Sequence, residues 1–471
     1  MVRYISLLLL VIVVACQKNK NDSDFKANEA VLDQETYEAC LIAKDLIYNQ
    51  GSDYGVSCYD RYLHYSWKGQ TEPANKQLQI ASFNLWHLGD GTVPGKDIDL
   101  VASIMNRWDL VAALEIMKPS AQVKYGSHHK VNKSWWEYSQ TDYDPEIIKS
   151  ISISSPKYLE LLDKLRLLDE SWSLVLSPAA MGSSVNHQEL TGFYYRGSVV
   201  KPKVNSYCGG YACYLDLYGS ADKVARYPLV ADFKSGDFSF TALAYHARFD
   251  SMKASDITPD IADDRILSEL DFYDKNFNPD GALRAPMAQA FRFVELNVIM
   301  KEIENLKNTI NNPKIILMGD FNLEQTANNN NIWDEVLGSH ELYVEDLSSI
   351  SETNRYASAY DHFVFDPDIV PECAGNQARA IDFTDSSDVP EFAQAWRERQ
   401  LHINEIMSEE AACLKLKFNN KGVNRCMTEL NLNKLYEKIS TQLTYNEEKP
   451  YLHYKNMISD HLPVVLPCSW Y

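Results

Sequence analysis

The sequence predicts an α/β protein built from layers of strands and helices, and three observations support this fold class. Apolar runs of strand length, bounded by polar and turn residues, follow one another from Leu78 onward. Residues 291–299 instead repeat their apolar side chains at helical spacing. The chain of 471 residues is 45% hydrophobic and 23% charged. This composition is ordinary for a folded protein and excludes disordered, fibrous and multispan membrane classes.

A helical region is expected first, over residues 28–49, within a small N-terminal extension that continues to about residue 77. The strands that follow are rich in the β-branched and aromatic residues that favour sheets. They are expected at residues 78–85, 108–116, 192–200, 227–233, 238–247, 314–321, 360–365 and 462–467. A helical segment precedes residue 314, and a second, polar helical insertion covers about 382–448. Strands interleaved with helices in this way predict a layered domain.

The net charge is −20, from 45 Lys and Arg against 65 Asp and Glu. This balance argues against a histone-like nucleic-acid binder, in which basic patches dominate affinity. It is compatible with an enzyme that meets phosphate through a divalent cation held by acidic side chains.

The N-terminus has the layout of an export signal. One Arg precedes an apolar run over residues 5–15, which is shorter than the ~18–20 residues of a spanning helix. The run ends in Val13-Val14-Ala15-Cys16, which resembles a bacterial lipoprotein box with Val13 where Leu is usual. We therefore expect a signal peptide over residues 1–15 and a lipid on Cys16, followed by a polar tether. The alternative is a plain cleaved signal peptide with a fortuitous cysteine.

The cysteines favour disulfides. Nine are present, so an even eight remain beside Cys16, in a chain expected in an oxidising compartment. Cys208 and Cys213 flank a short loop that one bridge could close, and Cys413 and Cys426 could staple the polar helical insertion. The connectivity of the others is left open, because eight cysteines allow about 105 pairings.

Polar residues at the ends of the expected strands are the candidates for chemistry. Taken singly, such residues are more often caps or turns. Together they are informative, because strand ends in layered α/β proteins converge on one rim where catalytic sites are built. They are Asn84, Glu115, His246, Asp320, Asn322, Asp361, Asp460 and His461.

Two kinds of chemistry are combined in this set. Glu115, Asp460 and Asn84 offer the hard oxygen ligands that Mg²⁺ prefers. His246 and His461 can transfer protons near neutrality. The further carboxylates Glu189 and Asp361 could fix the tautomers of these histidines. No nucleophile-elbow, zinc-protease or phosphate-cradling motif competes, so the pattern favours metal-assisted attack of water on a phosphoester.

The ordered segments that carry these residues resemble a known family. IASFNLW, LVAALE, AYHA, LMGDFN, AYDH and ISDHLP occur in the order of the endonuclease/exonuclease/phosphatase superfamily and are similar to its pancreatic-type deoxyribonuclease branch. QELTGFYYR, CGGYAC and RYP match further local segments of that branch. The resemblance covers about residues 78–466. It implies a four-layer sandwich of two mixed β-sheets packed face to face, with helices on both outer sides.

The resemblance also implies roles for individual residues. The metal ligands would be Asn84 and Glu115, with Asp460 beside them. Glu189 would support His246, and Asp361 would support His461. Asp320 and Asn322 would bind phosphate or metal or orient the attacking water, and Arg226 would clamp a nonbridging phosphate oxygen. The implied cofactor is Mg²⁺ or Mn²⁺, with a structural Ca²⁺ as a possible addition.

Three positions depart from the family pattern. Leu114 stands where Gln is usual before the metal glutamate, Met117 stands in place of a groove-contacting arginine, and His187 stands in place of a tyrosine. These changes leave the chemistry intact and count against duplex minor-groove binding.

The sequence thus predicts an exported, lipid-anchored, divalent-metal-dependent nuclease that hydrolyses DNA, and it leaves open whether RNA is also a substrate. It is expected as a monomer without a protein partner, at the outer membrane, cell surface or periplasm. The catalytic domain would span residues 78–471 after a tether and extension over 16–77, with insertions at about 119–178, 250–312 and 376–450. The alternatives are a phospholipid or sphingomyelin phosphodiesterase, a phosphomonoesterase, and a binding lipoprotein with a dead site.

Overall fold

The computed structural model describes residues 64–65, 76–89, 96–117, 123–125, 129–131, 151–152, 157–177, 180–181, 189–217, 224–248, 265–266, 285–310, 312–344, 346–385 and 448–470. The predicted signal peptide, Cys16, the tether, the helical region at 28–49 and the cysteine pair 413 and 426 lie outside these residues. No helix in the described part of the chain is both long and apolar enough to cross a membrane.

The first sheet has the strand order β1-β7-β8-β3-β2-β17-β16. Its centre is a parallel pair, β2 and β3, and the other neighbours are antiparallel. The strands are β1 (His64–Tyr65), β2 (Gln77–Leu88), β3 (Leu110–Met117), β7 (Trp172–Leu176), β8 (Glu189–Arg196), β16 (Arg379–Ala380) and β17 (Val464–Ser469). Parallel neighbours need a crossover, and helix α4 (Ile98–Met105) provides it between β2 and β3.

The second sheet has the order β10-β11-β12-β13-β15-β14, with β9 paired to β11. It also has one parallel pair, β12 with β13, in a sheet whose other pairings are antiparallel. The strands are β9 (Lys201–Lys203), β10 (Ala212–Tyr214), β11 (Leu229–Ser235), β12 (Phe238–His246), β13 (Ile315–Asp320), β14 (Glu341–Tyr343) and β15 (Asp361–Phe365). Helix α10 (Ala285–Thr309) lies in the crossover between β12 and β13.

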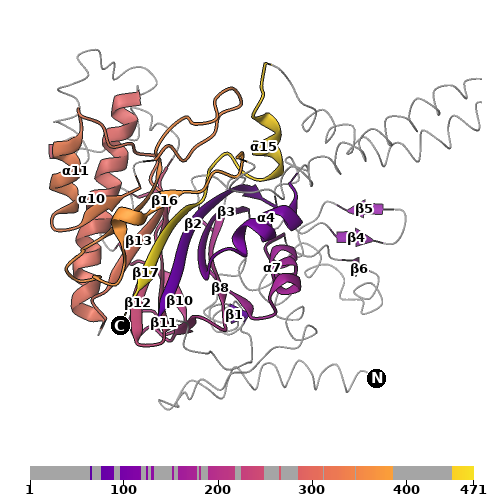
Figure 1. The fold of residues 1–471 in the computed structure, drawn as a ribbon, viewed down its shortest axis with the longest axis horizontal. Helices are drawn as coiled ribbons and strands as arrows, with labels where there is room; N and C mark the ends of the chain where they lie inside the picture. The colour runs from indigo at the N-terminus through magenta and orange to yellow at the C-terminus, as the bar shows by residue number, and fades with distance from the viewer. Residues whose placement is uncertain are drawn as a thin grey trace, which may run out of the picture.

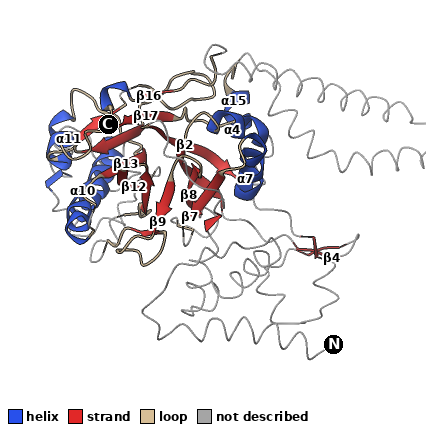
Figure 2. Ribbon diagram, turned by 60° about the horizontal axis from the view of Figure 1, so that its bottom comes forward, coloured by secondary structure: helices blue, strands red, loops and turns tan. Residues whose placement is uncertain are grey.

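The two sheets pack face to face, and helices cover their outer faces. Figures 1 and 2 show α10 and α11 (Asn330–Leu337) outside the second sheet, and α4 and α7 (Lys157–Leu168) outside the first. Helix α15 (Leu452–Met457) lies on the same side as α4. The predicted four-layer α/β sandwich is therefore confirmed.

The alternation of side chains along the central strands explains why they read as nearly continuous apolar runs. In β3, Leu110, Ala112 and Leu114 enter the core between the sheets. Val111 and Ala113 point the other way, into the core beneath the helices of the first sheet. Strands covered on both faces bury every side chain in this way.

Two disulfides lie in the described residues. Cys208 and Cys213 are bridged, five residues apart, which confirms that prediction. Cys373 and Cys468 are also bridged, 95 residues apart. This second bond joins the segment after β15 to the end of β17 across an isolated β-bridge. Its pairing was not predicted, because the two cysteines meet only when these distant segments are packed.

The predicted insertion at 119–178 contains two kinds of structure. A small sheet of β4 (Val123–Tyr125), β5 (His129–Val131) and β6 (Ile151–Ser152) lies within it. Helix α7 and strand β7, by contrast, belong to the main layers of the sandwich. The described part of the 376–450 segment holds a 3₁₀ turn, Gly375–Gln377, and β16.

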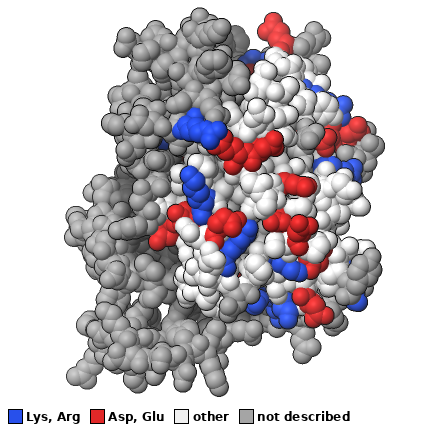
Figure 3. All heavy atoms as spheres, turned by 90° about the vertical axis from the view of Figure 1, so that its left-hand side faces the viewer, with Lys and Arg blue, Asp and Glu red and all other residues white. Residues whose placement is uncertain are grey.

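The face of the molecule on the α10 and α11 side carries acidic and basic side chains close to one another. Figure 3 shows Lys and Arg interspersed with Asp and Glu there, without a large area of one sign. Such a surface is typical of a solvated outer face.

Candidate active site

The register of the second sheet places three predicted residues next to one another. His246 ends β12 and is opposite Asp320, which ends the parallel strand β13. Asp320 is in turn opposite Asp361, which begins β15. The strand-end rule therefore holds for these three residues, since their side chains start from one edge of the sheet.

Asn84 and Glu115 reach the site differently. Both were expected to end their strands, and this is wrong, because β2 continues to Leu88 and β3 continues to Met117. The strand register shifts beyond Asn84 in β2 and around Glu115 in β3. Such irregularities bend a strand and re-aim a side chain. The two residues lie at these irregularities, within otherwise regular strands.

Backbone strain is concentrated around these residues. Trp86, His87, Glu115 and Asn322 have φ values of 39°, 57°, 53° and 49°. They are four of the six non-glycine residues with positive φ in the described chain. Bulky side chains rarely adopt this conformation, and strained residues that persist cluster at active sites and ligand clamps. The strain supports a functional assignment for this rim.

Gly319 allows β12 and β13 to meet closely enough to build the site. Its φ is 150°, and a Cβ atom there would lie 1.8 Å from the carbonyl oxygen of Tyr245. Tyr245 and Gly319 directly precede His246 and Asp320. Any side chain at position 319 would therefore separate the strands at the point where they present these two residues.

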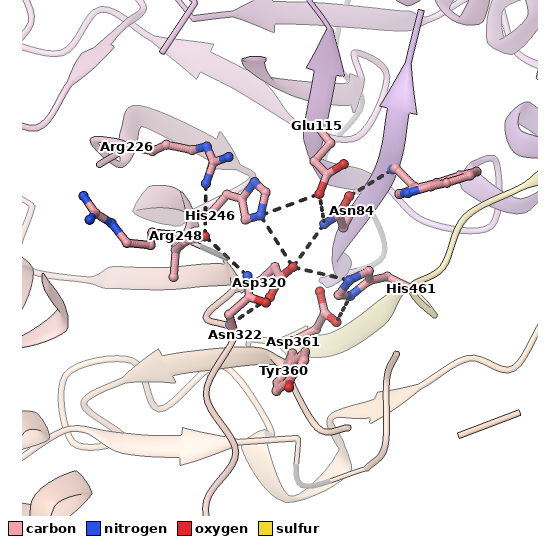
Figure 4. A network of polar contacts seen from close by, with 12 residues as sticks. Asn84, Glu115, Arg226, His246, Arg248, Asp320, Asn322, Tyr360, Asp361 and His461 are labelled. Atoms are coloured by element: carbon pink, nitrogen blue, oxygen red, sulfur yellow. Dashed lines mark hydrogen bonds and ion pairs between the residues drawn. The ribbon is translucent and has the colours of Figure 1, made fainter. Parts of the chain in front are cut away.

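The carboxylate of Asp320 lies at the centre of the polar network (Figure 4). Its Oδ2 accepts a hydrogen bond of 3.1 Å from Nδ2 of Asn84. The same oxygen is 3.7 Å from Nε2 of His246 and 3.4 Å from Nε2 of His461. Its Oδ1 accepts from the backbone N–H of Asn322 at 2.8 Å. Asp320 thus joins the two sheets and both histidines.

A carboxylate contacts Nδ1 of each histidine, the ring nitrogen that does not face Asp320. Nδ1 of His246 is 2.7 Å from Oε2 of Glu189, and Nδ1 of His461 is 2.7 Å from Oδ2 of Asp361. All four side chains are buried. Each imidazole therefore presents Nε2 to Asp320, and its Nδ1 orientation is set by its carboxylate.

These contacts shift the pKa values of both histidines in the same direction. Burial alone would lower the pKa of His246, but the charge of Glu189 and its hydrogen bond outweigh burial and raise it. Burial opposes protonation of His461 too, yet Asp361 and Asp320 raise its pKa well above the usual value. Both imidazoles therefore favour the protonated form more than a free histidine does.

The carboxylates shift according to their surroundings. Burial raises the pKa of Asp320, as does the neighbouring charge of Asp361, although the two histidines oppose this. Burial also tends to raise the pKa of Glu189, but His246 and Arg226 lower it overall. Glu189 is therefore the firmly ionised partner, whereas Asp320 lies where negative charge is crowded.

Glu115 and Asn84 complete the side of the site that belongs to the first sheet. Nδ2 of Asn84 donates to Oε1 of Glu115 at 3.0 Å, and this oxygen is 3.6 Å from Nε2 of His246. The other oxygen of Glu115 accepts from the backbone N–H of His87 at 3.1 Å. Oδ1 of Asn84 accepts from the N–H of Trp86. Asn84 therefore faces Glu115 and Asp320 with its amide nitrogen, and would have to rotate for its oxygen to bind a cation.

Asp460 lies beside the network with a different partner. Its Oδ2 is 3.1 Å from Nζ of Lys455 in α15. Its Oδ1 is buried and has no hydrogen-bond partner among the described residues. The contacts of Asp460 therefore lead to α15, whereas those of Asn84 and Glu115 lead to Asp320.

The donor set fits a hard divalent cation. Ligand atoms of Asp320, Asp361 and His461 lie within 4.8 Å of one another in a buried group. Oδ1 of Asp361, like Oδ1 of Asp460, is buried without a hydrogen-bond partner in the described chain. Clustered carboxylate oxygens with unused lone pairs suit Mg²⁺ or Mn²⁺. The assignment of the cation to Asn84, Glu115 and Asp460 stays a prediction, and Asp320, Asp361 and His461 form a second possible ligand group.

Arg226 and Asn322 border the site next to His246. The guanidinium of Arg226 pairs with Glu189 and donates to the carbonyl of Ala247 at 3.1 Å. Nδ2 of Asn322 donates to the same carbonyl at 3.3 Å (Figure 4). Arg226 thereby supports Glu189, and its contact with phosphate stays a prediction.

Two residues that support the site were missed from the sequence. The buried hydroxyl of Ser348 donates to Oδ2 of Asp361 at 2.7 Å, which extends the His461 pair by one member. Arg292 of α10 donates to the carbonyls of Arg248 and Asn322, and so ties together the chain beyond β12 and β13. A charged residue within the apolar run of α10 was the available signal for Arg292. Ser348 lies in no motif.

The fold is similar to those of solved structures, although no family model and no curated protein matches the chain. An endonuclease/exonuclease/phosphatase family protein from Leptotrichia buccalis is 12% identical with a TM-score of 0.38, covering 83% of this chain and all of its own. A protein of that family from Bacteroides thetaiotaomicron is 11% identical with a TM-score of 0.39, covering 84% of this chain and 98% of its own. D. rerio TDP2 complexed with a single-strand DNA product is 14% identical with a TM-score of 0.29, covering 62% and 84%. At these identities and TM-scores the likenesses say nothing about activity.

Proposed function

We propose that the chain is a divalent-metal-dependent phosphodiesterase that hydrolyses nucleic acid, with DNA as its main substrate. The observation that carries the proposal is the placement of two imidazoles around one carboxylate. His246 and His461 each present Nε2 to the same oxygen of Asp320, and each is held on Nδ1 by a buried carboxylate. Two oriented proton carriers beside a cluster of oxygen ligands suit the hydrolysis of a phosphoester.

The cation, the two histidines and Asp320 would have separate roles in the reaction. A divalent cation held by Asn84, Glu115 and Asp460 would neutralise phosphate charge and lower the pKa of a water molecule. Because Nδ1 of each histidine is occupied, any proton gained or lost at the reacting centre moves through Nε2. The raised pKa values of His246 and His461 favour donation to a phosphate or leaving oxygen. Asp320, between the two rings, can accept a hydrogen bond from the attacking water.

The exposed aromatic ring in the described part of the chain does not support a lipid interface. A lipid phosphodiesterase inserts exposed apolar or aromatic side chains into the bilayer surface. The exposed large hydrophobic residues of the described chain are one aromatic, Tyr356, and four aliphatic residues, Leu167, Leu168, Val204 and Leu347. That ring lies against the guanidinium of Arg355, and its hydroxyl donates to Asp382, so it is held in a polar network.

The test is to incubate the full-length protein in detergent with plasmid, single-stranded DNA, RNA and sphingomyelin vesicles, with Mg²⁺ or with a chelator. We expect Mg²⁺-dependent cleavage of DNA that the His461→Ala variant loses. His340→Ala is a matched control, because this histidine packs near the end of α11 and contacts Lys307. Cleavage of sphingomyelin with every nucleic acid left intact would refute the proposal in favour of a lipid phosphodiesterase. Hydrolysis of p-nitrophenyl phosphate but not of its diester would favour a phosphomonoesterase.

Export and anchoring form a second part of the proposal. The apolar run over residues 5–15 and the Val13-Val14-Ala15-Cys16 sequence support a lipid on Cys16 and a location at the outer membrane or cell surface. The bridge between Cys208 and Cys213 agrees with an oxidising compartment. Fractionation of cells that express the protein tests the location.

A further inference from the structure

Lys96 is a half-buried cation that the proposed chemistry does not use. It directly precedes Asp97, the N-cap of α4. Its Nζ donates to the backbone carbonyl of Leu85 at 2.5 Å and to that of Ile458 at 2.7 Å. Burial lowers the pKa of this lysine to about 7, although the charges of Asp460 and Glu115 oppose the shift. Withdrawing an ammonium even partly from water is costly unless hydrogen bonds compensate, and these two carbonyl groups provide them.

The two carbonyl groups belong to the two segments that carry the candidate ligands. Leu85 directly follows Asn84 in β2, and Ile458 lies two residues before Asp460. These segments are about 370 residues apart in the chain, and Lys96 joins them through a single ammonium group. The backbone N–H of Asp97 adds a bond of 2.8 Å to the carbonyl of Met457.

A second side chain makes the same connection. The hydroxyl of Ser459, which is fully buried, donates to the carbonyl of Asn84 at 2.6 Å and accepts from the backbone N–H of His461 at 3.1 Å. Ser459 therefore links Asn84 to His461 directly, while Lys96 links the neighbouring residues. Together they set the separation between a predicted metal ligand and one of the two histidines.

We propose that Lys96 is a positioning residue that holds the Asn84 segment and the Ile458–His461 segment in register, so that side chains from both can share one divalent cation. The inference rests on the proposed function, because it concerns the cation of that site. Groups that orient ligands without touching the metal typically change affinity by about 10–100-fold when they are removed. A structural residue that affected only folding would leave the affinity of the folded protein unchanged.

The experiment measures Mn²⁺ binding to the purified full-length protein by calorimetry, without substrate. Lys96→Met keeps the apolar stem and removes the donor, and we expect Mn²⁺ affinity to fall by about tenfold or more. Lys164→Met is the matched control, because it removes a lysine of α7 that pairs with Asp99, and its affinity should equal that of the wild type. Loss of a positive charge by itself would tighten Mn²⁺ binding, so tighter binding by Lys96→Met would overturn the proposal.

Ser459→Ala keeps the test decisive if Lys96→Met does not fold. It removes the other link and leaves the charge of Lys96 in place, and it should also weaken Mn²⁺ binding. The double variant should lose less than the sum of the two single losses, because both side chains hold the same pair of segments. Unchanged affinity in folded variants with a lower melting temperature would show a merely structural role and overturn the inference. A wild-type protein that binds no Mn²⁺ would instead contradict the proposed function, and the inference with it.

Discussion

Asp361→Asn tests the pairing of Asp361 with His461. The substitution keeps the shape of the side chain but removes the charge that faces Nδ1 of His461 at 2.7 Å and the hydroxyl of Ser348 at 2.7 Å. We expect turnover to fall by about 10²–10⁴-fold, the range found for positioned acids, bases and the carboxylates that orient them. The loss is expected because Asp361 both stabilises the imidazolium and sets the nitrogen that faces Asp320.

The size of the expected loss of turnover follows from the hydrogen bond between Asp361 and His461. A hydrogen bond to a charged group contributes about 1.5–3 kcal/mol, and about 1.4 kcal/mol corresponds to a factor of ten. Loss of imidazolium stabilisation therefore accounts for about ten- to hundredfold. The rest of the expected loss of turnover arises because the Asn amide can hydrogen-bond to the wrong tautomer of His461 and stabilise it.

The same pair makes stability depend on pH with a definite sign. The folded-state pKa of His461 is raised above its unfolded value, so protonation favours the folded protein. This stabilisation is fully present below the unfolded pKa of about 6.5 and is lost as pH rises through the folded pKa. In Asp361→Asn the pH-dependent part of the free energy of unfolding should be smaller. Urea unfolding at a series of pH values measures this difference.

The assay is hydrolysis of bis(p-nitrophenyl) phosphate and of plasmid DNA with Mg²⁺. Asp382→Asn is a matched control, because Asp382 is equally a buried carboxylate but pairs with Arg355 and accepts from Tyr356. The double variant Asp361→Asn with His461→Ala should be no slower than His461→Ala alone, since the pair acts as one unit. Fully additive losses would refute the pairing on which this reasoning depends.

Further outcomes are expected elsewhere in the chain. Glu115→Gln, like a chelator, should abolish nuclease activity, and restored activity at high Mg²⁺ in the variant alone would show that it weakened cation binding. Gly319→Ala should lower the free energy of unfolding by at least about 1–3 kcal/mol in urea titrations, because its Cβ would overlap the neighbouring strand; an unchanged stability would contradict the close approach. Breaking the Cys208–Cys213 bridge should change the melting temperature little, since it closes a very short loop. Cys16→Ala should move the protein from the membrane to the soluble fraction, and unchanged membrane association would rule out the lipid anchor.

Local patterning was enough to predict several central elements of the fold. The run IILMGD reads as a buried strand and forms β13, and the helical spacing around Phe291 and Phe293 corresponds to α10. These signals are short-range, because strand and helix periodicity depend on neighbours within a few residues. The placement of His246 and Asp320 at the ends of neighbouring strands also followed from the sequence, since parallel strands bring their carboxyl ends to one edge.

Contacts between distant segments were decided by the tertiary structure. Asn84 and Asp320 are 236 residues apart, and their hydrogen bond exists only because the two sheets pack face to face. No local pattern marks Asp320 as the residue that both histidines face.

The same limit applies to the supporting residues. Ser348 and Lys96 belong to no motif. Their roles are recognised only from the carboxylate and the carbonyl groups that they contact. The strand irregularities at Asn84 and Glu115 were hidden for a related reason. Periodicity predicts that a strand exists, but where its ladder breaks depends on the packing around it. The sequence by itself therefore determined the elements and the residue types of the site, whereas their grouping required long-range packing that no short segment encodes.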